Sequence, residues 1–166
     1  MAGDLNWITA RPIAHRGLHD RARGIVENTP GAFQAAIDKG FAIECDVQIT
    51  ADGEAVVFHD FALERLTNGA GRVANHTAAA LKALDIRDSG DRIGTLADMF
   101  ALVRGQALIV CEIKSTFVGD MRLTDRVAEV AKRYSGPLVI KSFDPRIVGH
   151  WQDKRTGIPA GIVAEL

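Results

Sequence analysis

Several residue types are scarce in this chain of 166 residues, and each scarcity excludes a class of protein. Its two cysteines, Cys45 and Cys111, are too few for a disulfide framework, so we expect reduced, buried thiols. The 20 basic residues nearly balance the 21 acidic ones and leave a net charge of -1. With so little net charge, and only one Tyr and two Trp to stack on bases, the composition argues against a nucleic-acid partner.

Long apolar runs are also missing from the sequence. No segment reaches the roughly 18 consecutive apolar residues that a membrane-spanning helix needs. The first twelve residues, MAGDLNWITARP, lack the basic start and apolar stretch of a signal peptide. We therefore predict no membrane span and a cytoplasmic location. The 47% of hydrophobic and 25% of charged residues are typical of a globular domain.

What the sequence does contain is an alternation of short runs rich in Ile and Val with segments of helical period. This alternation predicts strand and helix units on a largely parallel sheet. Capping residues such as Thr29, Thr95 and Asp144 mark helix starts. The pattern weakens over 61–93, where we predict a small insertion within a single domain, 1–166. The six predicted strands are 12–15, 41–50, 55–59, 107–114, 138–142 and 160–163.

The second and third predicted strands are joined by only a few residues around Asp52 and Gly53. A parallel connection needs about a dozen residues, so this pair is predicted to be an antiparallel hairpin. A two-residue turn at Asp52-Gly53 would bring His59 opposite Asp46 on one face. A three-residue turn with a bulge at Gly53 is the alternative, and it shifts the register by one residue.

Acidic residues interrupt two of the apolar runs. Glu44 and Asp46 are two residues apart and therefore share one face of their strand, and Glu112 lies in another strand. Carboxylates are seldom buried without a partner, because desolvating the charge is costly. A hard divalent cation, Mg2+ or Ca2+, would offset their repulsion. The alternative is simple pairing with Arg or Lys, which is the commoner reason for an isolated Glu-x-Asp.

Histidines and basic residues follow the predicted strands. His15 ends the first strand and His59 the third, and a side chain with a pKa of about 6.5 suits a general acid or base. Arg16 and Lys114 could hold a phosphate, although either type is more often a salt-bridge partner. All these groups fall at the C-terminal ends of strand runs, where α/β barrels and open α/β sheets place active sites.

Taken together, these segments resemble the glycerophosphodiester phosphodiesterase family. The likeness extends from about residue 11 to the end of the chain, and the stretch after His59 resembles the family's small insertion. Two positions depart from the family pattern: Cys45 replaces a branched aliphatic residue and Gly94 replaces a Pro. The matching segments are His15-Arg-Gly, Glu27-Asn-Thr, Glu44-Cys-Asp, the run from Asp52 to Asp60, Glu112-Ile-Lys and Ser142-Phe-Asp-Pro.

The resemblance implies a TIM (β/α)8 barrel and the metal-dependent hydrolysis of a glycerophosphodiester to glycerol 3-phosphate and an alcohol. It also implies one bound Mg2+ or Ca2+ ion. The roles it assigns are metal ligand for Glu44, Asp46 and Glu112, general acid or base for His15 and His59, and phosphate binding for Arg16 and Lys114.

The chain is short for such a barrel. Six strands are predicted where the barrel has eight, so we expect the last two strand-helix units to be lacking and the C-terminus to be incomplete. The unclosed edges would invite self-association with another chain. Two alternatives stay open: a non-catalytic metal-binding fragment or interaction module of the barrel, and a related phospholipase-type phosphodiesterase.

Overall fold

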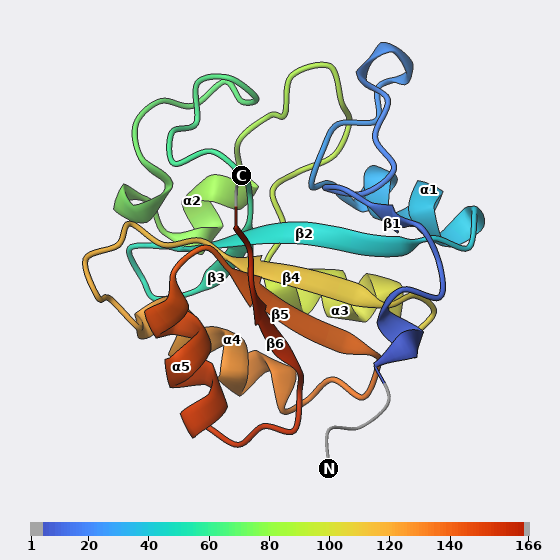
Figure 1. Cartoon of the computed structure of the whole chain (residues 1–166). Coiled ribbons are helices and arrows are strands. Elements are labelled where there is room, and N and C mark those ends of the chain that lie inside the picture. The colour runs from blue at the N-terminus through green and yellow to red at the C-terminus, as the bar shows by residue number, and fades with distance from the viewer. Residues whose placement is uncertain (1–4, 165–166) are drawn as a thin grey trace.

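The computed structural model describes residues 5–164, which form an open sheet with helices packed against it (Figure 1). The strand order is β1-β2-β4-β5-β6, all parallel, and β3 pairs antiparallel with β2 outside this path. The strands are β1 (Ile13–Ala14), β2 (Ala42–Ile49), β3 (Ala55–Val57), β4 (Ile109–Ile113), β5 (Leu138–Ser142) and β6 (Ala160–Ile162). The helices are α1 (Pro30–Asp38), α2 (Ala78–Lys82), α3 (Leu96–Val103), α4 (Arg122–Ala131) and α5 (Pro145–Asp153), with short 3-10 turns at Asn6–Ile8, Arg21–Arg23 and Val73–Asn75.

The predicted order of strands and helices is confirmed. All six strands form, and the one predicted over 138–142 has the same bounds in the structure. Three helices begin where capping residues predict them, because the side chains of Thr29, Thr95 and Asp144 each accept a backbone N–H of the first turn. Helix α4 begins at Arg122 without a side-chain cap and ends at Ala131.

The hairpin of β2 and β3 has the three-residue turn, so the predicted two-residue turn is wrong. Val47 pairs with Val57, and the N–H of Phe58 donates to the carbonyl of Asp46 at 3.0 Å. Phe58 rather than His59 therefore lies opposite Asp46.

The cause of this register lies partly outside the hairpin. Gly53 adopts a left-handed conformation with φ +80°, as the bulged turn requires. The carboxylate of Asp52 in the same turn accepts the N–H of Ala78 at 3.0 Å, at the start of α2. The turn is thus tied to a helix 26 residues further along the chain.

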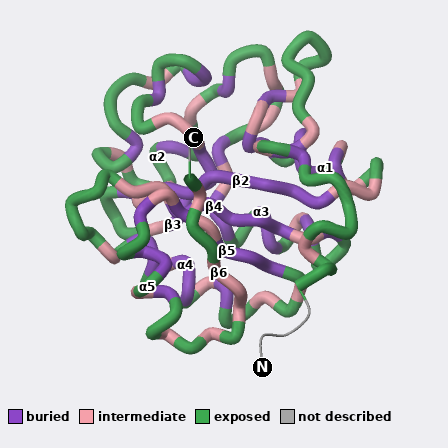
Figure 2. Tube along the Cα trace, in the orientation of Figure 1, coloured by how far each residue is buried: buried purple, intermediate pink, exposed green. Residues whose placement is uncertain are grey.

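Alternation along the strands divides the sheet into an apolar face and a polar face. On β2, Ile43, Cys45 and Val47 point into the main core, where they meet apolar side chains of α1, α3, α4 and α5. Figure 2 shows β2, β4 and β5 as the buried centre of the molecule. Cys45 and Cys111 lie directly beside each other on this apolar face, and both are free and buried, as predicted.

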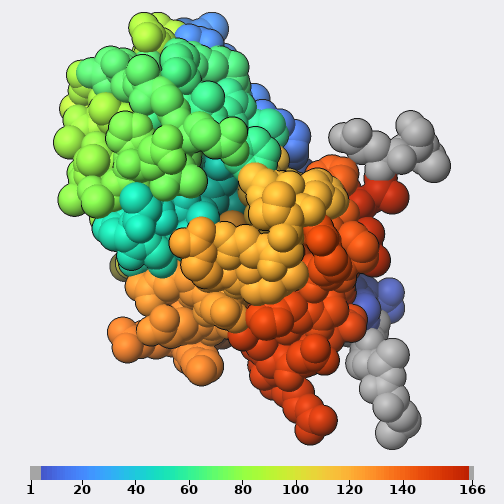
Figure 3. Space-filling view, turned by 90° about the vertical axis from the view of Figure 1, so that its left-hand side faces the viewer, coloured from blue at the N-terminus to red at the C-terminus, as the bar shows by residue number. Residues whose placement is uncertain are grey.

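Residues 61–93 cover a second hydrophobic core, separate from the main one. Figure 3 shows this green to yellow-green segment as a compact mass beside the rest of the chain. The assignment of residues 1–166 to one domain with an insertion at 61–93 stays a prediction. The buried side chains of the segment 61–93 pack with those of Val26 and β3. They include Leu63, Leu66, Val73, Leu81, Ile86 and Ile93.

The parallel sheet is open, with β1 and β6 at its two edges. Ile162 of β6 is 61% exposed. The prediction of two missing strands counted β3 among the six strands of the barrel. Because β3 lies off the parallel path, the described residues supply five parallel strands where a TIM barrel has eight. Within 5–164, no helix is long and apolar enough to cross a membrane.

Candidate metal and phosphate site

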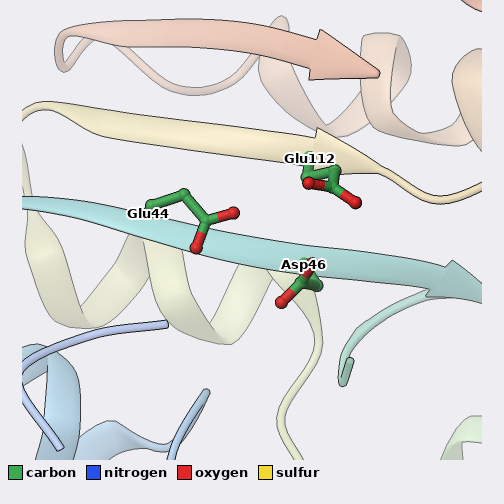
Figure 4. A group of neighbouring side chains, drawn as sticks. All are labelled: Glu44, Asp46 and Glu112. Atoms are coloured by element: carbon green, nitrogen blue, oxygen red, sulfur yellow. The ribbon is translucent and has the colours of Figure 1, made fainter. Parts of the chain in front are cut away.

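Three carboxylates meet on the polar face of the sheet (Figure 4). Glu44 and Asp46 project from β2, and Glu112 projects from β4 directly beside Asp46. One ligand oxygen from each residue lies within 4.8 Å of the other two, and no more than 4% of any of the three residues is exposed. The structure thus brings the three predicted acids together, while their role as ligands stays a prediction.

Two lysine ammonium groups lie between these carboxylates. Lys114 Nζ is 3.0 Å from Asp46 Oδ1 and 3.0 Å from Glu112 Oε1. Lys141 Nζ is 3.0 Å from Glu44 Oε1 and 3.0 Å from Glu112 Oε2. Burial alone would lower the pKa of Lys141, but attraction and hydrogen bonds to the two glutamates raise that pKa above its usual value. The acids therefore do both things that the sequence allowed: they lie close together, and they pair with basic residues.

Two residues with left-handed backbones also contact the carboxylates. Arg16 (φ +58°) donates its backbone N–H to Glu44 Oε2 at 2.9 Å, and its Nε lies 3.7 Å from Asp46 Oδ2. Asn28 (φ +56°) donates through Nδ2 to Asp46 Oδ2 at 2.9 Å and accepts the N–H of Asp46 at 3.2 Å. Such a backbone is unfavourable for Arg, so the fold holds this loop against a local cost.

The two predicted catalytic histidines occupy different environments. His15 Nε2 lies 3.9 Å from Glu44 Oε2, and its side chain is 67% exposed. His59 Nδ1 lies 2.8 Å from Asp60 Oδ1. The side chain of Gln48, on the same face of β2 as the acids, donates to the carbonyls of His59 at 3.1 Å and Asp60 at 2.6 Å. This contact holds the chain around His59 over the polar face.

An ion-pair network links the loops that carry the histidines. Arg65 donates to Glu27 and Asp60 at 2.7 and 2.9 Å, and Glu27 also accepts from Arg16 at 2.9 Å. Burial would raise the pKa of Glu27, but hydrogen bonds from the two arginines lower it to about 2. The hydrogen bonds from Arg65 are the main cause that lowers the pKa of Asp60 to about 2. An ionised Asp60 favours a proton on Nδ1 of His59 and leaves its Nε2 free.

Sequence reasoning did not identify Lys141, Gln48 or Arg65 as parts of this site. Lys141 had a readable signal, because it lies in a correctly predicted strand and directly beside Glu112. Gln48 and Arg65 act on loops whose positions depend on the hairpin register and on the segment 61–93. The alternation of β2 does place Gln48 on the face of Glu44 and Asp46, but no local pattern marks Arg65.

Residues 15–163 match the model of the glycerophosphoryl diester phosphodiesterase family. The chain belongs to this family. A glycerophosphodiester phosphodiesterase of Caldanaerobacter subterraneus is 37% identical over 142 residues, which are 80% of this chain and 57% of that protein. The resemblance drawn from the motifs is thereby confirmed.

Solved structures show the same fold. A phosphodiesterase of Oleispira antarctica, in complex with the product sn-glycerol-3-phosphate, superposes with a TM-score of 0.82 at 27% identity, over 92% of this chain and 65% of that one. A glycerophosphodiester phosphodiesterase of Agrobacterium tumefaciens gives a TM-score of 0.77 at 26% identity, over 90% and 65% of the two chains. The family fold is the TIM barrel, as predicted. This chain spans about 57 to 65% of these relatives' length.

The donor set of the acidic cluster fits a hard divalent cation. All three side chains offer carboxylate oxygens, which Mg2+ and Ca2+ prefer, and both cysteines lie on the opposite face of the sheet. The buried Glu44 Oε1 has the ammonium of Lys141 at 3.0 Å as its charged neighbour. A carboxylate oxygen has more than one lone pair, so this oxygen can also accept a metal ion.

Replacing Arg65 with Met is expected to change how stability depends on pH. The lowered pKa values of Glu27 and Asp60 contribute stability that is present above about pH 4.5 and lost as the pH falls toward about 2. Without Arg65 both pKa values rise, so the variant's deficit in unfolding free energy should be largest near about pH 6 and shrink toward about pH 3. Urea unfolding across this range measures it.

Arg122→Met is the matched control, because it breaks an exposed ion pair with Asp120 that contributes little. Its deficit should be small at every pH. An equal deficit of the Arg65 variant at both ends of the range would contradict the proposed role of the network.

Proposed function

We propose that this chain supplies the metal- and phosphate-binding site of an enzyme that hydrolyses glycerophosphodiesters to glycerol 3-phosphate and an alcohol. The observation that carries the proposal is the meeting of Glu44, Asp46 and Glu112 on one buried face, in a chain of this family. The product complex of the Oleispira antarctica relative supports the identity of the phosphate product. We propose Mg2+ or Ca2+ as the cation, since three carboxylates suit both.

The basic residues beside the acids are suited to the phosphate. Lys114 bridges Asp46 and Glu112 and Arg16 approaches Asp46, so both positive charges lie beside the acids. A bound divalent cation would polarise a phosphoryl oxygen. Lys114 and Arg16 would neutralise the charge that develops on the other phosphoryl oxygens in the transition state. Arg16 can also grip two oxygens at once, which orients the phosphate.

The two histidines are proposed as the general acid and base. Asp60 fixes the ring of His59 and leaves Nε2 free to accept or deliver a proton. His15 is largely exposed beside Glu44, where a substrate can reach it. Two imidazoles at separate loops allow one to take the proton of the attacking hydroxyl while the other protonates the departing oxygen.

A second candidate is a non-catalytic metal-binding fragment or interaction module. The open sheet favours it, because five parallel strands leave the polar face unclosed. The phospholipase-type alternative, the cytoplasmic location and the lack of a nucleic-acid partner stay predictions. Activity measurements on two chain lengths separate the first two candidates.

Chelation is expected to abolish glycerol 3-phosphate release from glycerophosphocholine, and added Mg2+ or Ca2+ to restore it. A coupled enzymatic assay measures this release on the present chain and on a version extended to the length of its relatives. Glu44→Gln should lower the rate about 100-fold or more, whereas Glu129→Gln, which alters an exposed acid on α4, should not. If only the extended version releases glycerol 3-phosphate, the present chain is the non-catalytic fragment. Full activity after both chelation and Glu44→Gln would refute the metal mechanism.

His15→Ala and His59→Ala are each expected to lower kcat about 100-fold or more, because each removes a proton-transfer group. Calorimetric titration with Mg2+ should show unchanged affinity in both variants, since neither side chain is a predicted ligand. His150→Ala is the control, because this histidine pairs with Asp125 away from the acidic cluster. Unchanged rates in the first two variants would remove the histidines from the mechanism.

The free strand edges are expected to promote self-association. Among residues 5–164, β6 pairs only with β5, and it ends in the exposed Ile162. Sedimentation velocity should show a concentration-dependent dimer or larger species, reduced by Ile162→Lys because charge on an edge strand opposes pairing. Val118→Lys, at an exposed residue outside the sheet, should leave the distribution unchanged. A monomer at all concentrations would argue against association through these edges.

A further inference from the structure

Lys141 has no role in the proposed reaction, yet its ammonium group lies within the acidic cluster. It projects from β5, and its Nζ lies 3.0 Å from an oxygen of Glu44 and 3.0 Å from an oxygen of Glu112. Those two carboxylates come from different strands, β2 and β4. Lys141 therefore bridges two of the three predicted metal ligands.

Each carboxylate of the cluster already has a cationic neighbour without a metal ion. The ammonium groups of Lys114 and Lys141 lie 3.0 Å from oxygens of Glu44, Asp46 and Glu112. Arg16 lies 3.7 Å from Asp46 and also pairs with Glu27. A divalent ion in this cluster is repelled by each ammonium group that stays in place.

Lys141 is held differently from Lys114. Lys114 follows the last residue of β4, whereas Lys141 lies inside β5, where its backbone is paired on both sides. The backbone of Lys141 is therefore held in place, and its side chain is the part that can move. On one side its strand neighbour is Glu112, and on the other it is Gly161 of β6.

Gly161 leaves room for that movement. It is an exposed residue without a side chain, and a Cβ placed there would meet nothing within 4 Å. Because paired residues of adjacent strands project to the same face, this space lies beside Lys141 on the polar face. Lys141 can thus lie over the carboxylates or turn toward β6.

We propose that Lys141 is a tethered cation that competes with the divalent metal ion for Glu44 and Glu112. It neutralises both carboxylates when the ion is absent, and it turns toward Gly161 when the ion binds. The cost of displacing it lowers the affinity for the metal. This inference rests on the proposed metal site, and it makes Lys141 a positioning residue for the ligands rather than a catalytic one.

Two substitutions are expected to change the metal affinity in opposite directions. Lys141→Gln removes the competing charge and should tighten Mg2+ binding about tenfold or more. Gly161→Val fills the space into which Lys141 turns and should weaken Mg2+ binding several-fold. Lys141→Arg keeps the charge and should bind about as the wild type does. Lys154→Gln is the control, because Lys154 is similarly buried but pairs with Asp125.

Isothermal calorimetry with MgCl2 on chelator-treated protein measures these affinities. Thermal unfolding gives a second readout: in EDTA, Lys141→Gln should melt below the wild type, and Mg2+ should raise its Tm by a larger increment. Should this variant fail to fold, Gly161→Val carries the test alone.

The outcomes separate this inference from the proposed function. If the wild type binds Mg2+ and Lys141→Gln binds it no more tightly, or if Gly161→Val binds as the wild type does, the competition is refuted while the metal site stands. If neither the wild type nor Lys141→Gln binds Mg2+ or Ca2+, the metal site itself is refuted, and the competition with it.

Discussion

The mutual repulsion of three buried carboxylates is the constraint on which the rest of the site depends. Desolvating a carboxylate costs on the order of several kcal/mol when it has no partner, and here three lie within reach of a single ion. The fold answers with charge from three directions: Lys114 after β4, Lys141 on β5 and Arg16 after β1. Even the unfavourable backbone of Arg16 contributes, because it directs an N–H to Glu44.

The period of two along a strand lets one sheet serve stability and chemistry together. In β2 the odd-numbered residues pack against the helices, and the even-numbered residues Glu44 and Asp46 face the site. The helix-covered face fixes the strand register, and that register places Asp46, Glu112 and Lys141 side by side across three strands. A slip of one residue would bury the acids among apolar side chains and break the cluster.

The sequence predicts this arrangement well wherever a local pattern carries the information. Strand periodicity placed Glu44 and Asp46 on one face of their strand, and the caps at Thr29, Thr95 and Asp144 placed the helix starts. The register of the β2–β3 hairpin was not predictable, because a contact between Asp52 and the start of α2 helps to fix it. His59 pairs with its neighbour Asp60, but Arg65, the other partner of Asp60, lies in the segment 61–93, where no local pattern pointed to it.

An open sheet also changes what its edge residues can do. Lys141 is one strand away from the β6 edge, and Gly161 on that edge leaves space beside it. In a tightly enclosed site a lysine between two glutamates would be a permanent salt bridge, since removing either charge alone is costly. Space beside the ammonium gives it a second position that solvent can stabilise. The same ion pair that stabilises the metal-free cluster therefore sets how readily the cluster exchanges its cation.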